Sequence, residues 1–269
     1  MKRIVHCFLL LTVSVVYIYS FNVTNKEFYS ILEGYYSGKI EELSTKNDED
    51  AYINRFNKFK ETLGEMNPDI KSYFINLADY QIARLLQNKE GRKNSSKSYS
   101  VLKSTQNSLL KLIASTNFKE LEKVVQSDIY RVLGDVNLML LRYVGGAALS
   151  KLANETRKYL EKSLKINSKN SFANTSIASW YLYAPRIAGG SPNKTLSFAQ
   201  LGFKHAQTEV EKYFANIWIS QAYFLLKNEK ESLEYIFKAS EIFPNGTFHQ
   251  IVLEQNRGGN LFMDFPIKN

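Results

Sequence analysis

The sequence predicts an all-α fold, a right-handed superhelical array of about five antiparallel helical hairpins that follows an N-terminal signal segment. Three observations predict it. The 269 residues include only five prolines and 13 glycines, too few for the many tight turns of a β-sandwich. The stretch from residue 213 to Pro244 shows the helical period twice, with a short polar break between. The same two-helix pattern recurs upstream, as in an array of repeated units.

The first 20 residues have the composition of a secretory signal. Lys2 and Arg3 precede an apolar run from Ile4 to Tyr19, which is short for a membrane span. We therefore expect cleavage before Phe21 and export of the chain to the periplasm or cell envelope. An uncleaved anchor is the alternative, because bulky tyrosines stand near the expected cut. Such an anchor would associate the protein with the membrane.

The first three hairpins are marked by apolar positions on their first helices. These positions are Phe28, Ile31 and Tyr35 in the first hairpin, Phe74, Leu77 and Ala78 in the second, and Tyr130, Leu133 and Gly134 in the third. The third hairpin has the clearest pattern, and its second helix carries Leu160, Ser163 and Leu164.

The fourth and fifth hairpins complete the predicted repeat domain, residues 21–245. In the fourth hairpin the first helix carries Ile177, Ala178 and Tyr181, and the second helix runs from about Asn193 to Gln207. In the fifth hairpin the first helix carries Ile219 and Tyr223, and the second carries Leu233, Ile236, Phe237 and Ala239. Only four or five polar residues around Asn228 join the last two helices, which must therefore be antiparallel. Residues 246–269 are expected to form a C-terminal cap or tail, mostly irregular from Asn256.

The two-helix unit resembles the tetratricopeptide repeat (TPR) family, in which small and apolar residues recur over two helices and a proline closes the unit. The matching residues of the fifth hairpin are Ile219, Ser220, Tyr223, Ser232, Ile236, Ala239 and Pro244. Equivalent positions fall near residues 28, 74, 130, 174 and 216. These spacings exceed the family's ~34 residues, so each unit carries extra residues.

Two of the extra segments contain glycine pairs, Gly145-Gly146 in the third hairpin and Gly189-Gly190 in the fourth. A phosphate-binding loop is not expected, since no strand precedes either pair and the spacing to a Lys-Thr dipeptide is wrong. We expect the glycines to close the first helices in the left-handed conformation, and Pro192 to start the next helix. The alternative is that these inserts shape a ligand mouth on one side of the array.

The mature chain as a whole is similar to the T-component (TatT-type) proteins of tripartite periplasmic transporters. The similarity lies in the Gly-Gly inserts, in the run SPNKTLSFAQLGFKHA and in the C-terminal residues Leu253, Gln255, Arg257, Leu261, Asp264 and Phe265. It implies an envelope protein that partners a periplasmic solute-binding protein and handles an apolar ligand. The chain departs from the lipoprotein members, because it has no cysteine after its apolar run.

Charge and cysteine content exclude several functions. Cys7 is the only cysteine and lies in the signal segment, so the mature chain is expected to have no disulfide, thiolate metal site or cysteine nucleophile. The formal net charge is +9, but the basic residues are spread along the chain, as on solvated helix faces. We therefore expect no nucleic-acid partner.

No catalytic arrangement is recognisable in the sequence. His205 and His249 lie on separate units without an acidic pattern at metal-ligand spacing, which indicates ordinary surface or packing residues. Carboxylates occur in polar breaks and at helix starts, where they favour the helix dipole. We therefore expect no enzymatic activity, no catalytic residue, no cofactor and no metal.

Binding is the remaining use of such an array, because stacked hairpins align their first helices along a concave face. The repeat template places on that face Arg131, Asp135 and Leu138 in the third hairpin, Ser179 and Leu182 in the fourth, and Ile217, Gln221 and Phe224 in the fifth. The alternative is that several of these are core residues between neighbouring helices.

The predicted function is an exported, non-catalytic interaction scaffold in the cell envelope, accessory to solute uptake. Apolar anchors with a few polar contacts suit a protein or peptide partner. A carrier of an apolar small ligand or lipid is the alternative, because the 17 tyrosines and 17 phenylalanines could line a cavity between helices.

Overall fold

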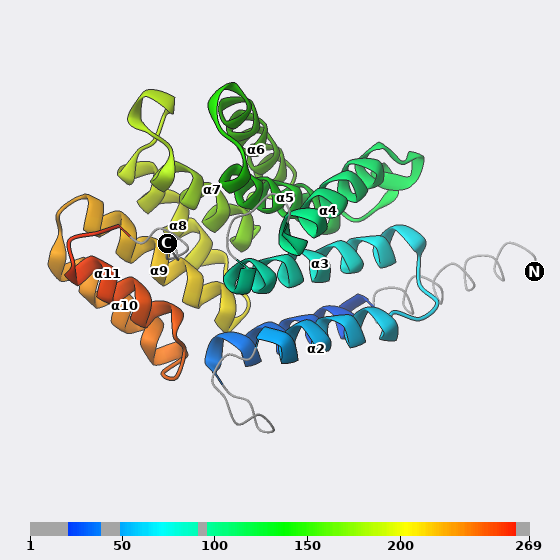
Figure 1. The fold of residues 1–269 in the computed structure, drawn as a ribbon, viewed down its shortest axis with the longest axis horizontal. Helices are drawn as coiled ribbons and strands as arrows, with labels where there is room; N and C mark the ends of the chain where they lie inside the picture. The colour runs from blue at the N-terminus through cyan, green and yellow to red at the C-terminus, as the bar shows by residue number, and fades with distance from the viewer. Residues whose placement is uncertain (1–20, 39–48, 91–95, 262–269) are drawn as a thin grey trace, which may run out of the picture.

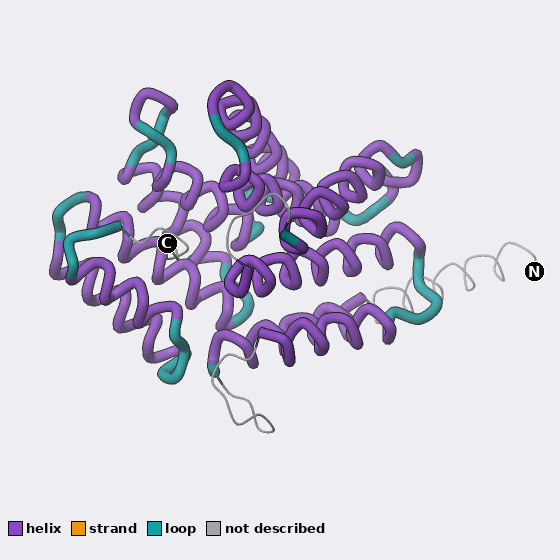
Figure 2. The backbone as a smooth tube through the Cα atoms, in the orientation of Figure 1, coloured by secondary structure: helices purple, strands orange, loops and turns teal. Residues whose placement is uncertain are grey.

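The structure, a computed structural model, describes residues 21–38, 49–90 and 96–261 (Figure 1). The predicted signal segment with Cys7, and the motif residues Asp264 and Phe265, lie outside the described residues. The described residues form helices and turns and contain no strand (Figure 2). Residues 21–37 form the N-terminal helix, which is followed by α2 (Glu49–Thr62), α3 (Pro68–Glu90), α4 (Lys97–Ala114), α5 (Lys123–Leu140), α6 (Gly146–Ile166), α7 (Ser171–Tyr183), α8 (Pro192–His205), α9 (Glu209–Leu225), α10 (Glu229–Ile242) and α11 (Phe248–Arg257). Within these ranges no helix has both the length and the apolar character needed to cross a membrane.

The predicted all-α array of hairpins is confirmed. The first helices of the five hairpins are the N-terminal helix, α3, α5, α7 and α9, and the second helices are α2, α4, α6, α8 and α10. Each second helix from α2 to α8 also contacts the first helix of the next hairpin, and α3, α5, α7 and α9 contact one another in sequence. The first helices therefore line the inner side of the array.

Polar caps determine where several helices begin. Asn170 accepts a hydrogen bond from the backbone N–H of Ala173, and Ser191 accepts one from Lys194, directly before α7 and α8. Thr208 and Glu211 form a reciprocal capping box at the start of α9. These contacts satisfy amide groups that have no partner within the helix.

Small residues allow the two helices of a hairpin to pack closely. A Cβ atom added to Gly134 on α5 would lie 2.5 Å from Leu160 on α6. The hydroxyl groups of Ser127 and Ser163 donate to each other's backbone carbonyls across the same pair of helices, at 3.0 and 2.7 Å. The small residues that identify the third hairpin in the sequence are therefore contact points between its helices.

The N-terminal helix joins the two ends of the array. Phe28 contacts Phe56 of the adjacent α2, with ring centroids 5.6 Å apart. Farther along the same helix, Tyr36 lies edge-on to Phe214 of α9 with ring centroids 4.7 Å apart. Figure 1 shows the blue N-terminal helices meeting the yellow and orange C-terminal ones. Contacts thus extend beyond neighbouring repeats, which are the usual limit in such proteins.

The helix α11 caps the last hairpin, in the segment expected to form a cap or tail, although its helical structure was not predicted. Its buried residues are His249 and Val252, and the backbone N–H of His249 donates to the Tyr213 hydroxyl at 3.0 Å. The same hydroxyl lies 3.2 Å from His249 Nδ1. Tyr213 is fully buried, so these polar contacts fix α11 against α9. His249 is a packing residue, as predicted.

Acidification is expected to weaken the docking of α11, because burial lowers the pKa of His249 below its ordinary value. The His249 imidazole therefore binds a proton more readily in the unfolded chain than in the folded one. The stabilising effect of neutral His249 is therefore complete above about pH 6.5 and is lost as the pH falls through its folded-state pKa. Thermal unfolding at pH 7.5 and pH 5 should show a smaller Tm advantage of the wild type over His249→Gln at pH 5. An unchanged advantage would contradict this.

The glycine inserts correct one expectation. The helices α5 and α7 do not end at glycines: α5 continues into the 3-10 turn Leu141–Tyr143, and α7 ends at Ala184 in an extended conformation. Gly146 (φ 57°) and Gly189 (φ 98°) adopt the left-handed conformation, but each follows a 3-10 turn and leads into a second helix. Pro192 occupies the first turn of α8 as predicted.

Gly190→Ala is expected to destabilise the second insert by about 1–3 kcal/mol. A Cβ atom at Gly190 would lie 1.7 Å from the carbonyl oxygen of Ala184, so the backbone must move. The matched control is Gly145→Ala, since no atom lies within 4 Å of the added Cβ and the residue is extended. Urea unfolding should separate the two variants. Equal midpoints would mean that the insert accommodates the methyl group freely.

Candidate ligand-binding cavity

A cavity of about 420 Å³ lies inside the array, between the first helices of all five hairpins. Its apolar walls are mostly aromatic. The aromatic lining residues are Phe28, Tyr29, Tyr36, Tyr80, Phe172, Tyr183, Phe214, Trp218 and Phe248. Seven aliphatic side chains, among them Leu149 of α6, and eight polar or charged side chains complete the lining. The size and the mixture are those of a small-molecule site.

Arg131 is held in a buried ion-pair network on α5. Its guanidinium donates to Asp128 one turn earlier, at 2.8 and 2.5 Å, and to Asp135 one turn later, at 3.0 Å. Asp128 also accepts hydrogen bonds from the Tyr73 hydroxyl at 2.6 Å and from the Asn170 amide at 3.3 Å. The i−3 and i+4 spacing places both carboxylates on the same face of α5 as the guanidinium.

The protonation states follow from this geometry. Burial by itself would raise the pKa of Asp128, but the Arg131 guanidinium and the hydrogen bonds hold it below the ordinary value. Burial raises the pKa of Asp135, against the opposing effects of Arg131 and of a hydrogen bond from Ser176. Burial by itself lowers the pKa of Arg131, yet its two carboxylate neighbours raise it well above the ordinary value. Arg131 therefore stays charged, and its charge is compensated locally.

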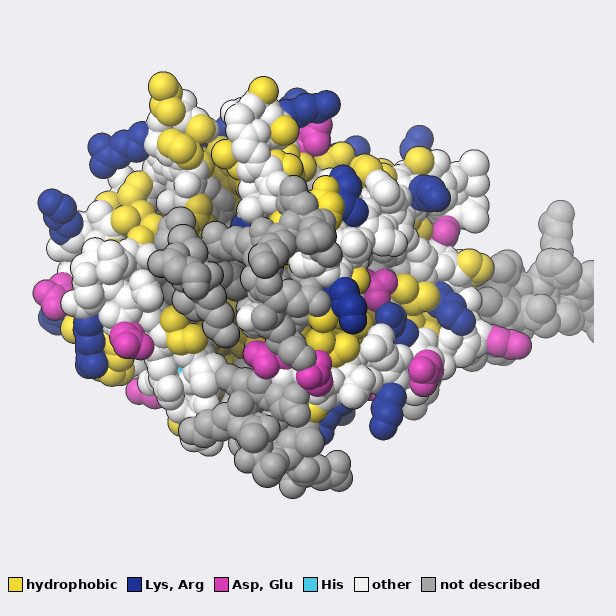
Figure 3. Space-filling model, in the orientation of Figure 1, with side chains coloured by type: hydrophobic (Ala, Val, Ile, Leu, Met, Phe, Trp, Pro, Cys, Tyr) yellow, Lys and Arg dark blue, Asp and Glu magenta, His cyan; other side chains and the backbone are white. Residues whose placement is uncertain are grey.

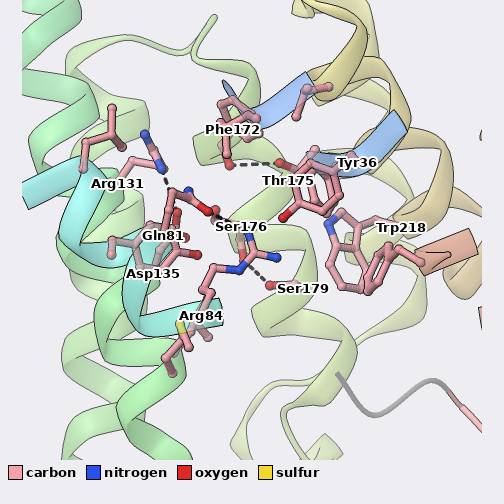
Figure 4. A pocket seen from close by; sticks show the side chains of 18 of the residues that line it. Tyr36, Gln81, Arg84, Arg131, Asp135, Phe172, Thr175, Ser176, Ser179 and Trp218 are labelled. Atoms are coloured by element: carbon pink, nitrogen blue, oxygen red, sulfur yellow. Dashed lines mark hydrogen bonds and ion pairs between the residues drawn. The ribbon is translucent and has the colours of Figure 1, made fainter. Parts of the chain in front are cut away.

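Arg84 lies in a different environment, on the α3 wall of the cavity. Its guanidinium carbon lies 5.7, 5.9 and 5.8 Å from the ring centroids of Tyr36, Tyr80 and Phe214. One of its N–H groups donates to the Gln81 side chain at 3.3 Å. Figure 4 shows Arg84 reaching across the cavity toward α7. Rings at this distance attract a cation through their electron-rich faces.

Four of the eight predicted binding residues line the cavity, and the other four do not. Arg131, Asp135, Leu138 and Ser179 line the cavity, as the repeat template indicated. The other four do not line it. Leu182, Ile217 and Gln221 are buried between helices, and Phe224 is half-buried. Of the insert glycines Gly145, Gly146, Gly189 and Gly190, none lines this cavity.

In the fifth hairpin the predicted lining positions on α9 are shifted along the helix from the residues that line the cavity. Phe214 and Trp218 line the cavity, each three residues before a predicted position, Ile217 and Gln221. Because successive residues of an α-helix are ~100° apart, an offset of three residues rotates the predicted face by about 60°. The spacing of Phe214 and Trp218, four residues apart on one helix face, was the sequence signal that could have identified the lining.

Three groups stand out among the lining residues that were not predicted. These are Tyr80, Gln81 and Arg84 on α3, the four residues Phe28, Tyr29, Leu32 and Tyr36 on the N-terminal helix, and Phe248 on α11. Repeat periodicity does not indicate that the N-terminal helix closes this side of the cavity, because its position depends on a contact with α9 at the other end of the array. In the described part of the chain, no three His, Cys, Asp or Glu side chains are grouped as metal ligands would be.

Two solved structures are similar to the chain. A thermophilic TPR protein from Thermus thermophilus has a TM-score of 0.51 and 15% identity, over 78% of this chain and 90% of that one. YrrB, a TPR protein with an unusual peptide-binding site, has a TM-score of 0.41 and 16% identity, over 77% and 84%. No protein-family model and no curated protein matches the sequence. The likeness to the Thermus protein shows that this chain has a TPR-like helical-repeat fold.

Proposed function

We propose that this TPR-like protein is a non-catalytic carrier that binds a small, mainly apolar molecule in the cavity between its first helices. The observation that carries the proposal is the 420 Å³ space whose mainly apolar walls are rich in aromatic side chains. Asp135, an acid in the lining, is engaged by Arg131 and Ser176. That engagement supports a binding role rather than acid-base catalysis.

The position of the N-terminal helix favours a small ligand over an extended peptide. A peptide bound by a helical-repeat protein lies along the concave face formed by the first helices. Here Tyr29 stacks on Phe172 at 6.1 Å and Tyr36 meets Phe214, so the N-terminal helix crosses that face. The space that remains beside it suits a molecule of small-ligand size.

Native mass spectrometry of the full chain isolated from cells tests the carrier proposal. The wild type should retain a bound molecule that Leu138→Trp lacks, because the larger side chain enters the cavity from α5. Leu201→Trp is the matched control, since Leu201 is 40% exposed on α8 and does not line the cavity. Bare wild-type protein, or a ligand unaffected by Leu138→Trp, would count against the proposal.

The proposed location is the cell envelope, and the proposed context is solute uptake. The basic and apolar composition of residues 1–20 supports export, and the similarity to transporter T-components supports an accessory role beside a periplasmic solute-binding protein. A carrier of this kind would transfer its ligand to or from such a partner. N-terminal sequencing of the mature protein tests the export step, with Phe21 as the expected first residue.

Protein docking is the second candidate function, and the insert between α7 and α8 favours it. Pro185, Ile187 and Ala188 are exposed there, and Ile187 is 99% exposed. Figure 3 shows hydrophobic side chains on the projecting tips at the top of the molecule. A photo-crosslinking residue at Ile187 should capture a specific envelope protein that the same residue at Leu110 of α4 does not. Identical products at both positions would contradict docking at this tip.

A further inference from the structure

Two loops project from one edge of the array. The first helices α5 and α7 both end at this edge, and an insert follows each of them before α6 and α8. Figure 1 shows both loops at the top of the molecule. We call residues 144–149 and residues 185–190 the insert tips. The helices behind them are joined, because the indole N–H of Trp180 on α7 donates to the Ala153 carbonyl on α6 at 3.0 Å.

The insert tips expose apolar side chains to solvent. Ile187 is 99% exposed, and Pro185 and Ala188 on the same tip are exposed as well. On the other tip, residues 147–149 are two alanines and a leucine, and all three are exposed. Single exposed apolar residues are common on protein surfaces, but a group of them on neighbouring tips indicates a contact surface for a protein or a membrane.

The charged residues beside the insert tips are basic. Lys151, Arg186 and Lys194 are exposed there. The sequence has no Asp or Glu in residues 136–154 or in residues 162–208, the two segments that contain the tips. Figure 3 shows basic side chains beside the hydrophobic tips. Apolar side chains insert into a bilayer, and Lys and Arg are attracted to anionic lipids, so this combination matches a membrane surface.

We propose that the insert tips dock the protein on a lipid bilayer with anionic head groups. Ile187 and Leu149 enter the apolar layer, and the three basic residues contact the lipid phosphates. A protein partner at Ile187 is the competing occupant. The charge pattern favours the bilayer, because the first acid beyond the first tip, Glu155, lies well inside α6.

Leu149 connects the docking surface with the cavity. Its side chain is 39% exposed on the first tip, and it also belongs to the cavity lining. Tyr183, the last residue of α7 before the second insert, lines the cavity as well. The cavity therefore reaches the edge of the array that faces the lipid. Membrane docking goes beyond the carrier function, since it identifies the surface across which an apolar ligand is exchanged.

A fluorescent label on the second tip measures insertion directly. Nitrobenzoxadiazole attached to Ile187→Cys, in a Cys7→Ser background of the full chain, should shift its emission to the blue when phosphatidylglycerol vesicles are added, because the label leaves water. The matched control is the same label on Phe237→Cys. Phe237 is 49% exposed on α10 but lies between Glu234 and Glu241 in the sequence. The control label should stay in water, even if the apolar run at residues 4–19 also binds the vesicles.

Replacing the basic residues tests the electrostatic part of the proposal. Lys151→Gln, Arg186→Gln and Lys194→Gln should each weaken binding to phosphatidylglycerol vesicles about fivefold, the effect of one charge near an anionic surface. Lys238→Gln is the control, since Lys238 pairs with Glu234 on α10 at 2.6 Å, and it should leave the affinity unchanged. Phosphatidylcholine vesicles should bind the tips more weakly than phosphatidylglycerol vesicles. Circular dichroism and Tm confirm that each variant is folded.

The outcomes separate membrane docking from the carrier function. An unshifted label at residue 187, equal shifts at residues 187 and 237, or equal binding to the two kinds of vesicle would overturn membrane docking. A photo-crosslink from residue 187 to an envelope protein in place of lipid would assign the tip to a protein partner and overturn it as well. Native mass spectrometry of the bound molecule does not depend on these readouts, so either proposal can fail alone.

Discussion

Replacing Asp128 with alanine is expected to lower the free energy of unfolding by about 3–5 kcal/mol, the cost of breaking a buried ion pair on one side. Arg131 is only 4% exposed and would keep a single carboxylate partner, Asp135. The Tyr73 hydroxyl, which is also buried, would lose its acceptor. The loss would act on three helices together, because Asn170 before α7 also donates to Asp128.

Urea denaturation at pH 7 measures this effect, with Asp79→Ala as the matched control. Asp79 pairs with Lys60 at 2.7 Å, but both side chains are about a quarter exposed, so this loss should stay within about 1 kcal/mol. The double variant Asp128→Ala/Arg131→Met should recover none of the lost stability, since it leaves the buried Asp135 without its cationic partner. If Asp128→Ala and Asp79→Ala cost the same, the network around Arg131 is not the stabilising unit inferred here.

The sign of the pH dependence follows from the pKa of Asp128. Its folded-state pKa lies below the ordinary value, so its contribution to stability is present above about pH 4 and is lost as the pH falls through the folded-state pKa. The difference between the wild type and Asp128→Ala should therefore narrow in strong acid.

The hairpins could be predicted from sequence because their signals are local. Gly134 faces Leu160, and Ser220 donates to the Ser232 carbonyl at 2.7 Å, so small residues recur where two sequential helices touch. The recurrence of apolar residues about every 3.6 positions then indicates which face of each helix is buried. Pro192 and the polar residues before each helix set several boundaries in the same local way.

The cavity could be predicted only in part, because its shape depends on contacts between distant segments. Arg131 and Asp135 were placed correctly by the template, since the third hairpin matches it best. Arg84 was missed, although it stands on a first helix, because the match in the second hairpin is weak. The Tyr36–Phe214 contact spans almost the whole array, and no repeat pattern encodes it.

This long-range contact leads to the second large effect. Tyr36→Ala should lower the free energy of unfolding by about 3–5 kcal/mol, as expected for a buried aromatic residue. Tyr36 is 6% exposed and packs on Phe214 and Tyr213 of α9, and Arg84 lies over its ring. Its removal should also separate the unfolding of the last hairpin from that of the first ones, because the remaining contacts join mainly neighbouring units.

Phe118→Ala is the matched control for this separation. Phe118 is also 6% exposed, but its ring packs on Tyr130 of the adjacent α5, 5.6 Å away. It should therefore lower stability without splitting the transition. In a Trp180→Phe background the tryptophan fluorescence reports Trp218 on α9 alone. This signal and circular dichroism of the whole chain should give coincident urea transitions for the parent protein and Phe118→Ala, and different midpoints for Tyr36→Ala. Coincident transitions in Tyr36→Ala would mean that nearest-neighbour contacts alone make the array unfold as one unit, and that the N-terminal helix serves only to form the cavity wall.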